Sequence, residues 1–325
     1  MTYTIEKVTT LIGARRYGDN DTNIGFILTD SRSLCFPEET LFFALKSERN
    51  DGHNYIPELY RRGVKNFVVT DVPKGYASDY PEANFLKVVN TLEALQRLAE
   101  RHRDEFNIPI VGITGSNGKT MVKEWLYQLL SPSMFVTRSP RSYNSQIGVP
   151  LSVWLMNEQT QVGVFEAGIS QPGEMLALRD IIQPTIAVLT NVGSAHQENF
   201  SSLEEKCREK LILFHDAETV VYDGDDEVIT KVVAEYPDYK GEKLFWSLQN
   251  PEAPFYVKKI EKQQSVSVVI YIYKGVEDSF SIPFIDDASI QNSIICAAVA
   301  SKIGLSAEDI DKRMAQLEPV AMRLE

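Results

Sequence analysis

The pattern of apolar and polar positions is clearest between residues 108 and 223. Short apolar runs of strand length alternate there with segments whose apolar residues recur at helical spacing. This order is typical of a parallel, doubly wound sheet in an α/β fold. The predicted strands are residues 110–114, 134–137, 162–166, 186–191 and 219–223.

The pattern changes after residue 243, where apolar and polar residues alternate with a period of two. Such alternation predicts a small antiparallel sheet packed beside the main one. Its predicted strands are residues 255–260, 266–273 and 280–284, and helices are predicted at 289–303 and 307–317.

The first 84 residues predict a separate small α/β domain. Buried strands are expected at 41–45 and 66–70, a short helix at 55–60 and a loop at 72–84. A helix at 91–106 follows, and we place the domain boundary before it. The predicted organisation is therefore 1–84, 85–318 and the start of a linker at 319–325.

Composition narrows the class of protein. The chain has 325 residues, 43% of them hydrophobic, and a net charge of -12, which argues against a nucleic-acid-binding surface. We expect no membrane span and no signal peptide, because the apolar runs are short and the N-terminus lacks the required pattern. Three scattered cysteines fit a reducing cytoplasm.

Residues 112–120 read Gly-Ile-Thr-Gly-Ser-Asn-Gly-Lys-Thr, between a predicted strand and a predicted helix. Glycines let backbone N–H groups converge on phosphate oxygens, and the positive end of a helix favours the same anion. Lys119 can reach the outer phosphates, and the Thr120 hydroxyl can hold Mg²⁺. The alternative is a glycine-rich turn without a ligand, since Ile113 stands where the common motif has glycine. The residues expected to bind ATP or GTP are Gly115, Ser116, Asn117, Gly118, Lys119 and Thr120.

Polar residues at the ends of other predicted strands are further candidates. Glu166 ends one strand, where a Mg²⁺ ligand is needed, although a surface glutamate is an equal reading. His196 follows another strand, but a histidine in a loop is usually solvated. Lys210 reads as a helix-surface lysine on residue type alone, and Asp223 reads as a nucleotide contact or as part of a solvated turn.

In the first domain, Asp30, Ser31 and Arg32 combine a carboxylate, a hydroxyl and a guanidinium on one loop. This cluster predicts either a site for a polar ligand or a capped turn.

Together these segments resemble the Mur ligase family. The phosphate loop matches the family's own loop, including Ile113. The other segments that carry the resemblance are 142–150, 165–168, 171–174, 191–202 and the position of Lys210, with 30–32, 41–45 and 51–53 in the first domain. The segment 165–174 resembles the branch that joins D-alanyl-D-alanine to UDP-MurNAc-tripeptide.

The chain departs from the family pattern in three places. An expected Asn-Asn pair is Asn144-Ser145, and in the late helix only Asn292 carries over as an ATP contact. Family members also continue into a C-terminal Rossmann-like domain after the segment that holds Arg323, a further ATP contact. We therefore expect that domain to be absent and the chain alone to bind UDP-substrate with little ligase activity.

The resemblance implies a mechanism and a ligand set. ATP would phosphorylate the tripeptide carboxylate, and the amine of D-alanyl-D-alanine would attack the acyl phosphate. Lys119, Glu166, His196 and Lys210 would be catalytic, with two Mg²⁺ ions held by Thr120, Glu166, His196 and Lys210 as a CO₂-derived carbamate. The UDP-substrate would contact Asp30, Ser31, Arg32, Asn144 and Ser145. The resemblance also implies a possible fusion to an alanine racemase.

Three alternatives remain at this stage. One is the family branch that adds the third amino acid of the stem, and another is a non-catalytic nucleotide-binding module. A phosphate-loop GTPase is a weaker reading, since the chain lacks a convincing guanine-reading Asn-Lys-x-Asp.

Overall fold

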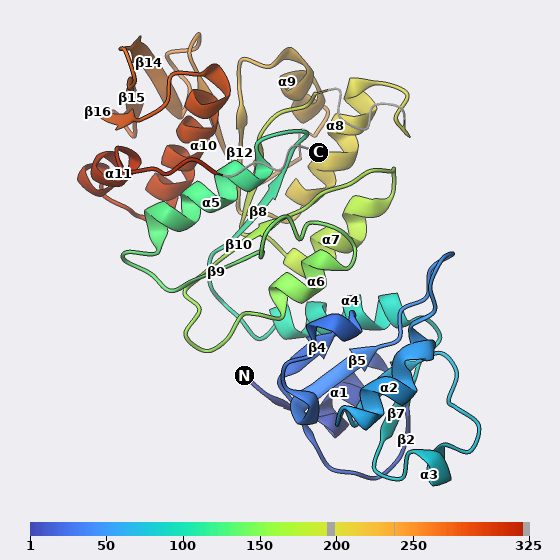
Figure 1. Cartoon of the computed structure of the whole chain (residues 1–325). Helices are drawn as coiled ribbons and strands as arrows, with labels where there is room; N and C mark the ends of the chain where they lie inside the picture. Colours follow the sequence, from blue (N-terminus) through green and yellow to red (C-terminus); the bar gives the residue numbers. More distant parts are fainter. Residues whose placement is uncertain (194–198, 237, 321–325) are drawn as a thin grey trace. The chain divides into compact units, whose positions relative to one another are not determined.

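The computed structural model describes residues 1–193, 199–236 and 238–320 and divides into two compact units (Figure 1). The first unit comprises Met1–Phe106 with Met156–Glu158, and the second comprises Asn107–Leu155 with Gln159–Glu325.

The first unit contains a five-stranded sheet in the order β2-β7-β6-β5-β4 and a short pair of strands, β1 and β3. Strands β4 to β7 are parallel, and β2 is antiparallel to β7. Its elements are β1 (Tyr3–Thr4), α1 (Ile5–Ile12), β2 (Arg15–Tyr17), β3 (Asn23–Ile24), β4 (Phe26–Leu28), η1 (Ser31–Ser33), η2 (Pro37–Glu39), β5 (Thr40–Phe43), η3 (Gly52–Tyr55), α2 (Ile56–Arg61), β6 (Asn66–Val69), α3 (Tyr76–Asp79), β7 (Asn84–Lys87) and α4 (Thr91–Arg103).

Helix α4 belongs with the first unit, so the division lies after Phe106 and later than the sequence interpretation places it. The helix packs against α1. Its buried His102 shares a 2.8 Å hydrogen bond with the Tyr3 hydroxyl. The Thr91 hydroxyl donates a hydrogen bond to the Ala44 carbonyl. The stretch expected as a loop also contains the short helix α3. The predicted loop at 72–84, which precedes α4, therefore does not mark the boundary between the two units.

The second unit is built on a nine-stranded sheet in the order β16-β15-β14-β13-β12-β11-β8-β10-β9. Its elements are β8 (Ile110–Thr114), α5 (Lys119–Leu130), β9 (Val136–Arg138), α6 (Gly148–Val153), β10 (Val162–Glu166), α7 (Glu174–Ile182), β11 (Ile186–Leu189), α8 (Leu203–Leu211), η5 (Ile212–Phe214), β12 (Thr219–Asp223), α9 (Glu227–Ala234), β13 (Glu242–Ser247), β14 (Phe255–Lys262), β15 (Ser267–Tyr273), β16 (Val276–Ile282), α10 (Asp287–Ile303) and α11 (Ala307–Met314). All five predicted strands are present.

Strands β8 to β13 are all parallel to one another, and helices cover both faces of this part of the sheet (Figure 1). Helix α5 packs against α10 on one face because its Val122, Trp125, Leu126 and Leu129 form an apolar stripe that is fully buried. The prediction of a doubly wound α/β fold is confirmed. The chain passes from β10 across β8 to β11, and ligands in such sheets bind at the carboxyl ends beside such a crossing.

The antiparallel strands continue the main sheet instead of forming a second one beside it. Strand β13, which the sequence interpretation missed, pairs in parallel with β12 and with the first residues of β14. Strands β14, β15 and β16 are then antiparallel. The prediction of an antiparallel group is thus confirmed, whereas its separation from the main sheet is wrong.

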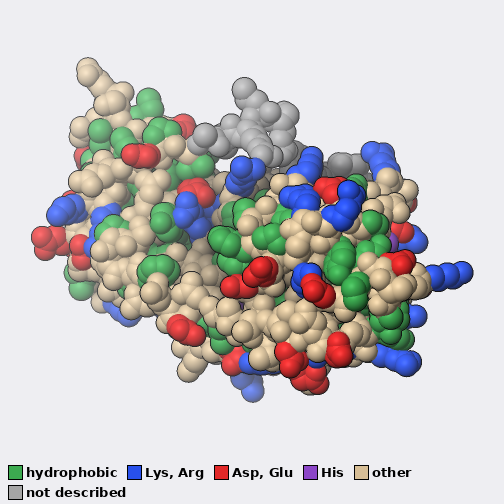
Figure 2. Space-filling view, turned by 60° about the horizontal axis from the view of Figure 1, so that its bottom comes forward, with side chains coloured by type: hydrophobic (Ala, Val, Ile, Leu, Met, Phe, Trp, Pro, Cys, Tyr) green, Lys and Arg blue, Asp and Glu red, His purple; other side chains and the backbone are tan. Residues whose placement is uncertain are grey.

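None of the helices among the described residues combines the length and the apolar character that a membrane span requires. Figure 2 shows Lys and Arg side chains interspersed with Asp and Glu over the face it draws.

Candidate functional site

The loop between β8 and α5 requires glycine at two positions. Gly115 has φ +146° and Gly118 has φ +81°, and both angles are unfavourable for residues with a side chain. A Cβ on Gly115 would lie 1.9 Å from the Thr190 hydroxyl oxygen, and one on Gly118 would lie 2.6 Å from Asn292 Oδ1. The backbone of the loop is therefore packed closely against the end of β11 and against α10.

The loop is also held by hydrogen bonds to the chain that follows β11. Gly193 N donates to Ser116 Oγ over 2.9 Å, and Asn117 N donates to Asn191 Oδ1 over 3.0 Å. The Thr190 hydroxyl donates to the Asn117 carbonyl over 2.5 Å. These bonds join two segments that are more than 70 residues apart in the sequence.

Lys119 and Thr120 begin α5 directly after the loop. Lys119 Nζ lies over the loop and donates to the Gly115 carbonyl at 2.8 Å. The Thr120 hydroxyl donates to Glu166 Oε2 at 3.1 Å, and the Glu166 side chain is fully buried at the end of β10. A hydroxyl and a carboxylate are the hard oxygen ligands that Mg²⁺ takes, so this pair fits such an ion.

Lys123 also belongs to this site, and the sequence interpretation missed it. Its Nζ lies 3.0 Å from Glu166 Oε1, and both side chains are fully buried. It lies one helical turn after Lys119, a spacing that places both lysines on one side of α5. That repeated lysine was the available signal, but it is equally typical of a solvated helix face.

Helix α8 adds two more buried lysines. Lys210 Nζ donates to the Gly115 carbonyl at 3.2 Å, and Lys206 Nζ donates to the Gly193 carbonyl at 2.5 Å. Burial, followed by the charges of Lys119 and Lys206, lowers the pKa of Lys210 to about 7. Three lysines therefore surround the loop in a chain of net charge -12, which is the electrostatic setting of an anion site.

The other predicted binding residues of the second unit lie beside the loop and beyond the end of β10. Asn292 lies on α10 against Gly118, with its Nδ2 3.2 Å from Met121 Sδ. The Asn144 carbonyl accepts a hydrogen bond from Gly168 N over 2.8 Å, just beyond Glu166. Ser145 Oγ accepts from Gly148 N at the start of α6.

Asp30, Ser31 and Arg32 lie in the first unit at the helical turn η1. Asp30 accepts from the Arg32 backbone N–H and guanidinium, and these hydrogen bonds lower the pKa of Asp30 to about 2. The Arg32 side chain is 87% exposed. The capped turn and the exposed polar cluster are therefore both present at this position.

His196 and Arg323 lie outside the described residues. Within the described part of the chain, no three His, Cys, Asp or Glu side chains gather where they could hold a metal ion. The contribution of His196 to a metal site therefore stays a prediction.

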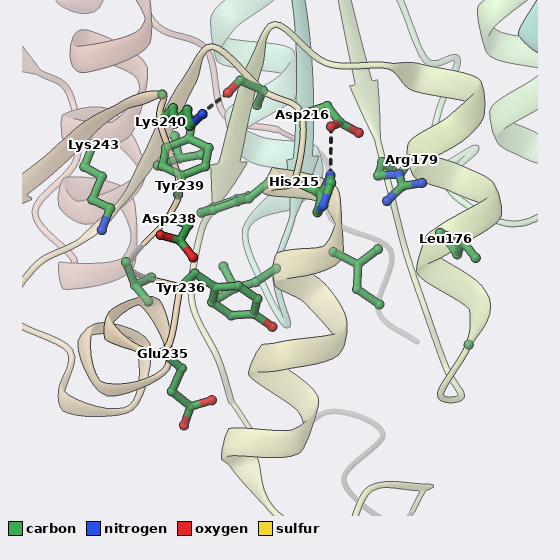
Figure 3. A pocket seen from close by; sticks show the side chains of 18 residues that line it. Leu176, Arg179, His215, Asp216, Glu235, Tyr236, Asp238, Tyr239, Lys240 and Lys243 are labelled. Carbon is green, nitrogen blue, oxygen red and sulfur yellow. Dashed lines mark hydrogen bonds and ion pairs between the residues drawn. The ribbon is translucent and has the colours of Figure 1, made fainter.

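A cavity of about 800 Å³ lies elsewhere in the second unit, at the amino ends of β12 and β13 (Figure 3). Its walls are the apolar side chains of Leu176, Ile212 and Phe214, with Arg179 and Lys243 among the polar residues. None of the residues discussed above at the phosphate loop lines it. The cavity therefore contributes nothing to the candidate site.

Comparison with known proteins identifies both units. The sequence model of the Mur ligase middle domain matches residues 113–300, and that of the "Mur ligase family, catalytic domain" matches residues 23–103. A Bacillus subtilis relative, UDP-N-acetylmuramoyl-tripeptide–D-alanyl-D-alanine ligase, is 29% identical over 311 residues, which is 94% of this chain and 64% of the relative. This chain thus spans less than two thirds of that relative's length.

Two solved structures are similar in fold. MurF from Acinetobacter baumannii has a TM-score of 0.89 at 24% identity, over all of this chain and 70% of that one. MurF ligase from Thermotoga maritima in complex with ADP has a TM-score of 0.78 at 25% identity, over 90% of this chain and 66% of that one.

Proposed function

This chain belongs to the Mur ligase family, and from that premise we propose that it provides the substrate-binding and ATP-binding parts of a ligase that joins D-alanyl-D-alanine to UDP-MurNAc-tripeptide. The observation that carries the proposal is the phosphate loop, with Lys119 and the buried lysines of α8 around it and Glu166 against Thr120. The name of the Bacillus relative supports the choice of reaction.

ATP is the proposed nucleotide, and the ADP complex of the Thermotoga protein supports a nucleotide in this fold. Backbone N–H groups of residues 115–118 and the Lys119 ammonium would hold the β- and γ-phosphates. Asn292, already against Gly118, and Arg323 are the proposed further contacts. The reaction is proposed for the cytoplasm, in keeping with three free cysteines.

Two magnesium ions are proposed beside the phosphates. Thr120 and Glu166 would hold the first ion, while Glu166, His196 and carbamylated Lys210 would hold the second. Bound Mg²⁺ supplies neutralisation of the charge that develops on the phosphoryl oxygens.

Carbamylation of Lys210 has physical support in the lowered pKa of this buried amine, about 7. Only the uncharged amine attacks CO₂, and near neutral pH a large fraction is uncharged. The new N–C bond forms as one N–H proton leaves to solvent, so the uncharged amine becomes a carbamate anion with two oxygens. ¹³C-labelled bicarbonate should give a carbamate NMR signal that Lys210→Met lacks.

The proposed reaction has two steps at one carboxylate. The tripeptide carboxylate attacks the γ-phosphorus of ATP, the bond to ADP breaks, and an acyl phosphate forms. The amine of D-alanyl-D-alanine then attacks the acyl carbon, releasing phosphate and a proton. Lys119 and Lys206 lie where they would orient and neutralise phosphate oxygens, which is most of what this chemistry requires.

The UDP-substrate is proposed to contact Asp30, Ser31 and Arg32 through its nucleotide, with Asn144 and Ser145 in the segment that recognises the muramoyl substrate. A fusion to an alanine racemase remains a prediction. Because the Bacillus relative extends over further residues, we infer that these 325 residues alone bind the UDP-substrate with little or no complete turnover.

The test is calorimetric titration of the chain with UDP-MurNAc-tripeptide, UDP-MurNAc-dipeptide and MgATP. Tighter binding of the tripeptide supports the proposal, tighter binding of the dipeptide supports the branch that adds the third amino acid, and binding of ATP alone supports a non-catalytic module. Hydroxylamine added with ATP and tripeptide should trap the acyl phosphate as a hydroxamate, which tests the first step without D-alanyl-D-alanine.

A further inference from the structure

Lys123 is the centre of a charge network behind the phosphate loop, in which Lys123 and Glu166 are fully buried. Its ammonium lies 3.0 Å from Glu166 Oε1 and 3.0 Å from Glu124 Oε1. Glu124 in turn accepts from Arg138 Nε at 3.0 Å. Two cations and two carboxylates thus alternate along the network, which is neutral as a whole.

The same ammonium also donates to the backbone carbonyl of Arg141. Arg141 has φ +49°, a left-handed conformation that is unfavourable for a residue with a side chain. Two residues earlier, Ser139 Oγ accepts a hydrogen bond from Glu166 N over 3.2 Å. The segment 139–141 is therefore fastened to the Glu166 backbone on one side and to Lys123 on the other.

This segment leads directly to Asn144, whose carbonyl accepts from Gly168 N. Lys123 thus joins three parts of the site that are distant in sequence: the helix after the phosphate loop, the carboxylate that ends β10, and the chain that approaches Asn144.

We infer that Lys123 is a positioning residue: by holding Glu166 Oε1 and the Arg141 carbonyl it directs Glu166 Oε2 toward Thr120 for the metal ion and sets the course of the 139–144 segment. This inference rests on the proposed function, because it assigns a role at the proposed magnesium and ATP site.

Stability alone does not account for the arrangement. A buried ion pair is a weak source of stability, since the cost of desolvating two charges offsets much of their attraction. The ion pair does fix the orientation of the Glu166 carboxylate. Of the two carboxylate oxygens of Glu166, one faces the ammonium and the other faces the Thr120 hydroxyl.

The test measures how much magnesium strengthens ATP binding to the 325-residue chain. ATP is titrated calorimetrically in excess Mg²⁺ and in EDTA, and the ratio of the two dissociation constants is the magnesium enhancement. Lys123→Met should lower this enhancement about 10-fold, as loss of a group that orients a metal ligand typically does. ATP affinity in EDTA should stay within about twofold of wild type, since Lys119 and the loop are untouched.

Four further variants keep the test decisive. Glu166→Gln should remove the enhancement, and adding Lys123→Met to it should change nothing more, because the orienting group then has no carboxylate to orient. If Lys123→Met does not fold, Lys123→Arg keeps the charge but cannot place it identically, and it should lower the enhancement at least about threefold. Lys231→Met, at an exposed pair with Glu204, is the matched control and should match wild type.

An unchanged enhancement in the folded Lys123 variant overturns the inference, and so does an equal loss of ATP affinity in Mg²⁺ and in EDTA. Neither result touches the proposed function, because wild type still shows its own enhancement. Failure of wild type to bind ATP at all overturns the proposed function and this inference with it.

Discussion

At the carboxyl ends of β8, β10 and β11, charged side chains are buried, and each has a defined partner. At the amino ends of β12 and β13, charged side chains stand around an apolar cavity instead (Figure 3). Glu166 and Lys123 have no exposed surface, whereas the side chains of His215 and Asp216 at the cavity are 68% and 71% exposed.

This difference shows that the apolar cavity is not the better candidate for chemistry. An apolar wall with exposed charges costs little to form, because water solvates the charges. A buried lysine or glutamate is costly unless paired, and several in one place indicate a site where fixed charge has a use. Substitutions at the two edges should therefore have different effects on ATP binding and on stability.

Lys119→Met should weaken ATP binding about 1,000-fold, or ~4 kcal/mol, because a charge contact to phosphate is lost. Calorimetric titration in Mg²⁺ measures the loss, and thermal unfolding should show an intact fold. A loss of less than about tenfold would mean that the carboxyl edge does not hold the phosphates.

Gly115→Ala should destabilise the second unit by about 3 kcal/mol, since the new Cβ meets the Thr190 hydroxyl at 1.9 Å and φ +146° is strained. Gly275→Ala is the matched control, because φ there is +78° and nothing lies within 4 Å of the added Cβ. It should cost about 1 kcal/mol. Urea unfolding compares the two, and equal losses would show that the contact with Thr190 does not matter.

Asp223→Asn tests a carboxylate at the carboxyl edge for which the described residues provide no ion-pair partner. Burial raises the pKa of Asp223 from 3.8 to about 6, and the carboxylates of Asp225 and Asp226 add to the rise. The folded state then binds the proton more tightly, so this stabilisation is complete below pH 3.8 and is lost as pH rises through 6.

Relative to wild type, Asp223→Asn should therefore gain about 1–2 kcal/mol between pH 4 and pH 8, after allowance for partial solvent screening. Urea unfolding at pH 4, 6 and 8 measures the difference. A difference that stays constant with pH would rule out this titration as its source.

Lys243→Met at the amino-edge cavity should change ATP affinity less than twofold and stability by less than about 0.5 kcal/mol. It is the amino-edge counterpart of Lys119→Met, measured in the same titrations. A large loss of ATP affinity here would break the contrast between the two edges.

Local patterns were sufficient to predict the glycine-rich loop and the strand and helix on either side of it. Strand β8, the glycine-rich turn and the buried stripe of α5 each span fewer than 15 consecutive residues. Residue propensities and the period of the apolar positions therefore identify them. Glu166 followed from its place at the end of an apolar run, and the structure puts it against Thr120.

Features that depend on distant pairing could not be predicted in this way. Lys123 and Glu166 are 43 residues apart, and nothing in a local window distinguishes this lysine from a solvated one. Strand β13 joins the antiparallel strands to the main sheet through two residue pairs with β14, a connection that alternation alone does not reveal. The α4 boundary was misplaced because packing with α1 decides which unit a helix joins.

The hydrogen bonds that join Ser116 and Asn117 to residues 190–193 affect both the rate of anion binding and its cost in conformational entropy. A loop already fastened in its native shape gives up little conformational entropy when a phosphate arrives. Association then requires no folding of the loop, and its rate depends on diffusion and on the positive field of the surrounding lysines.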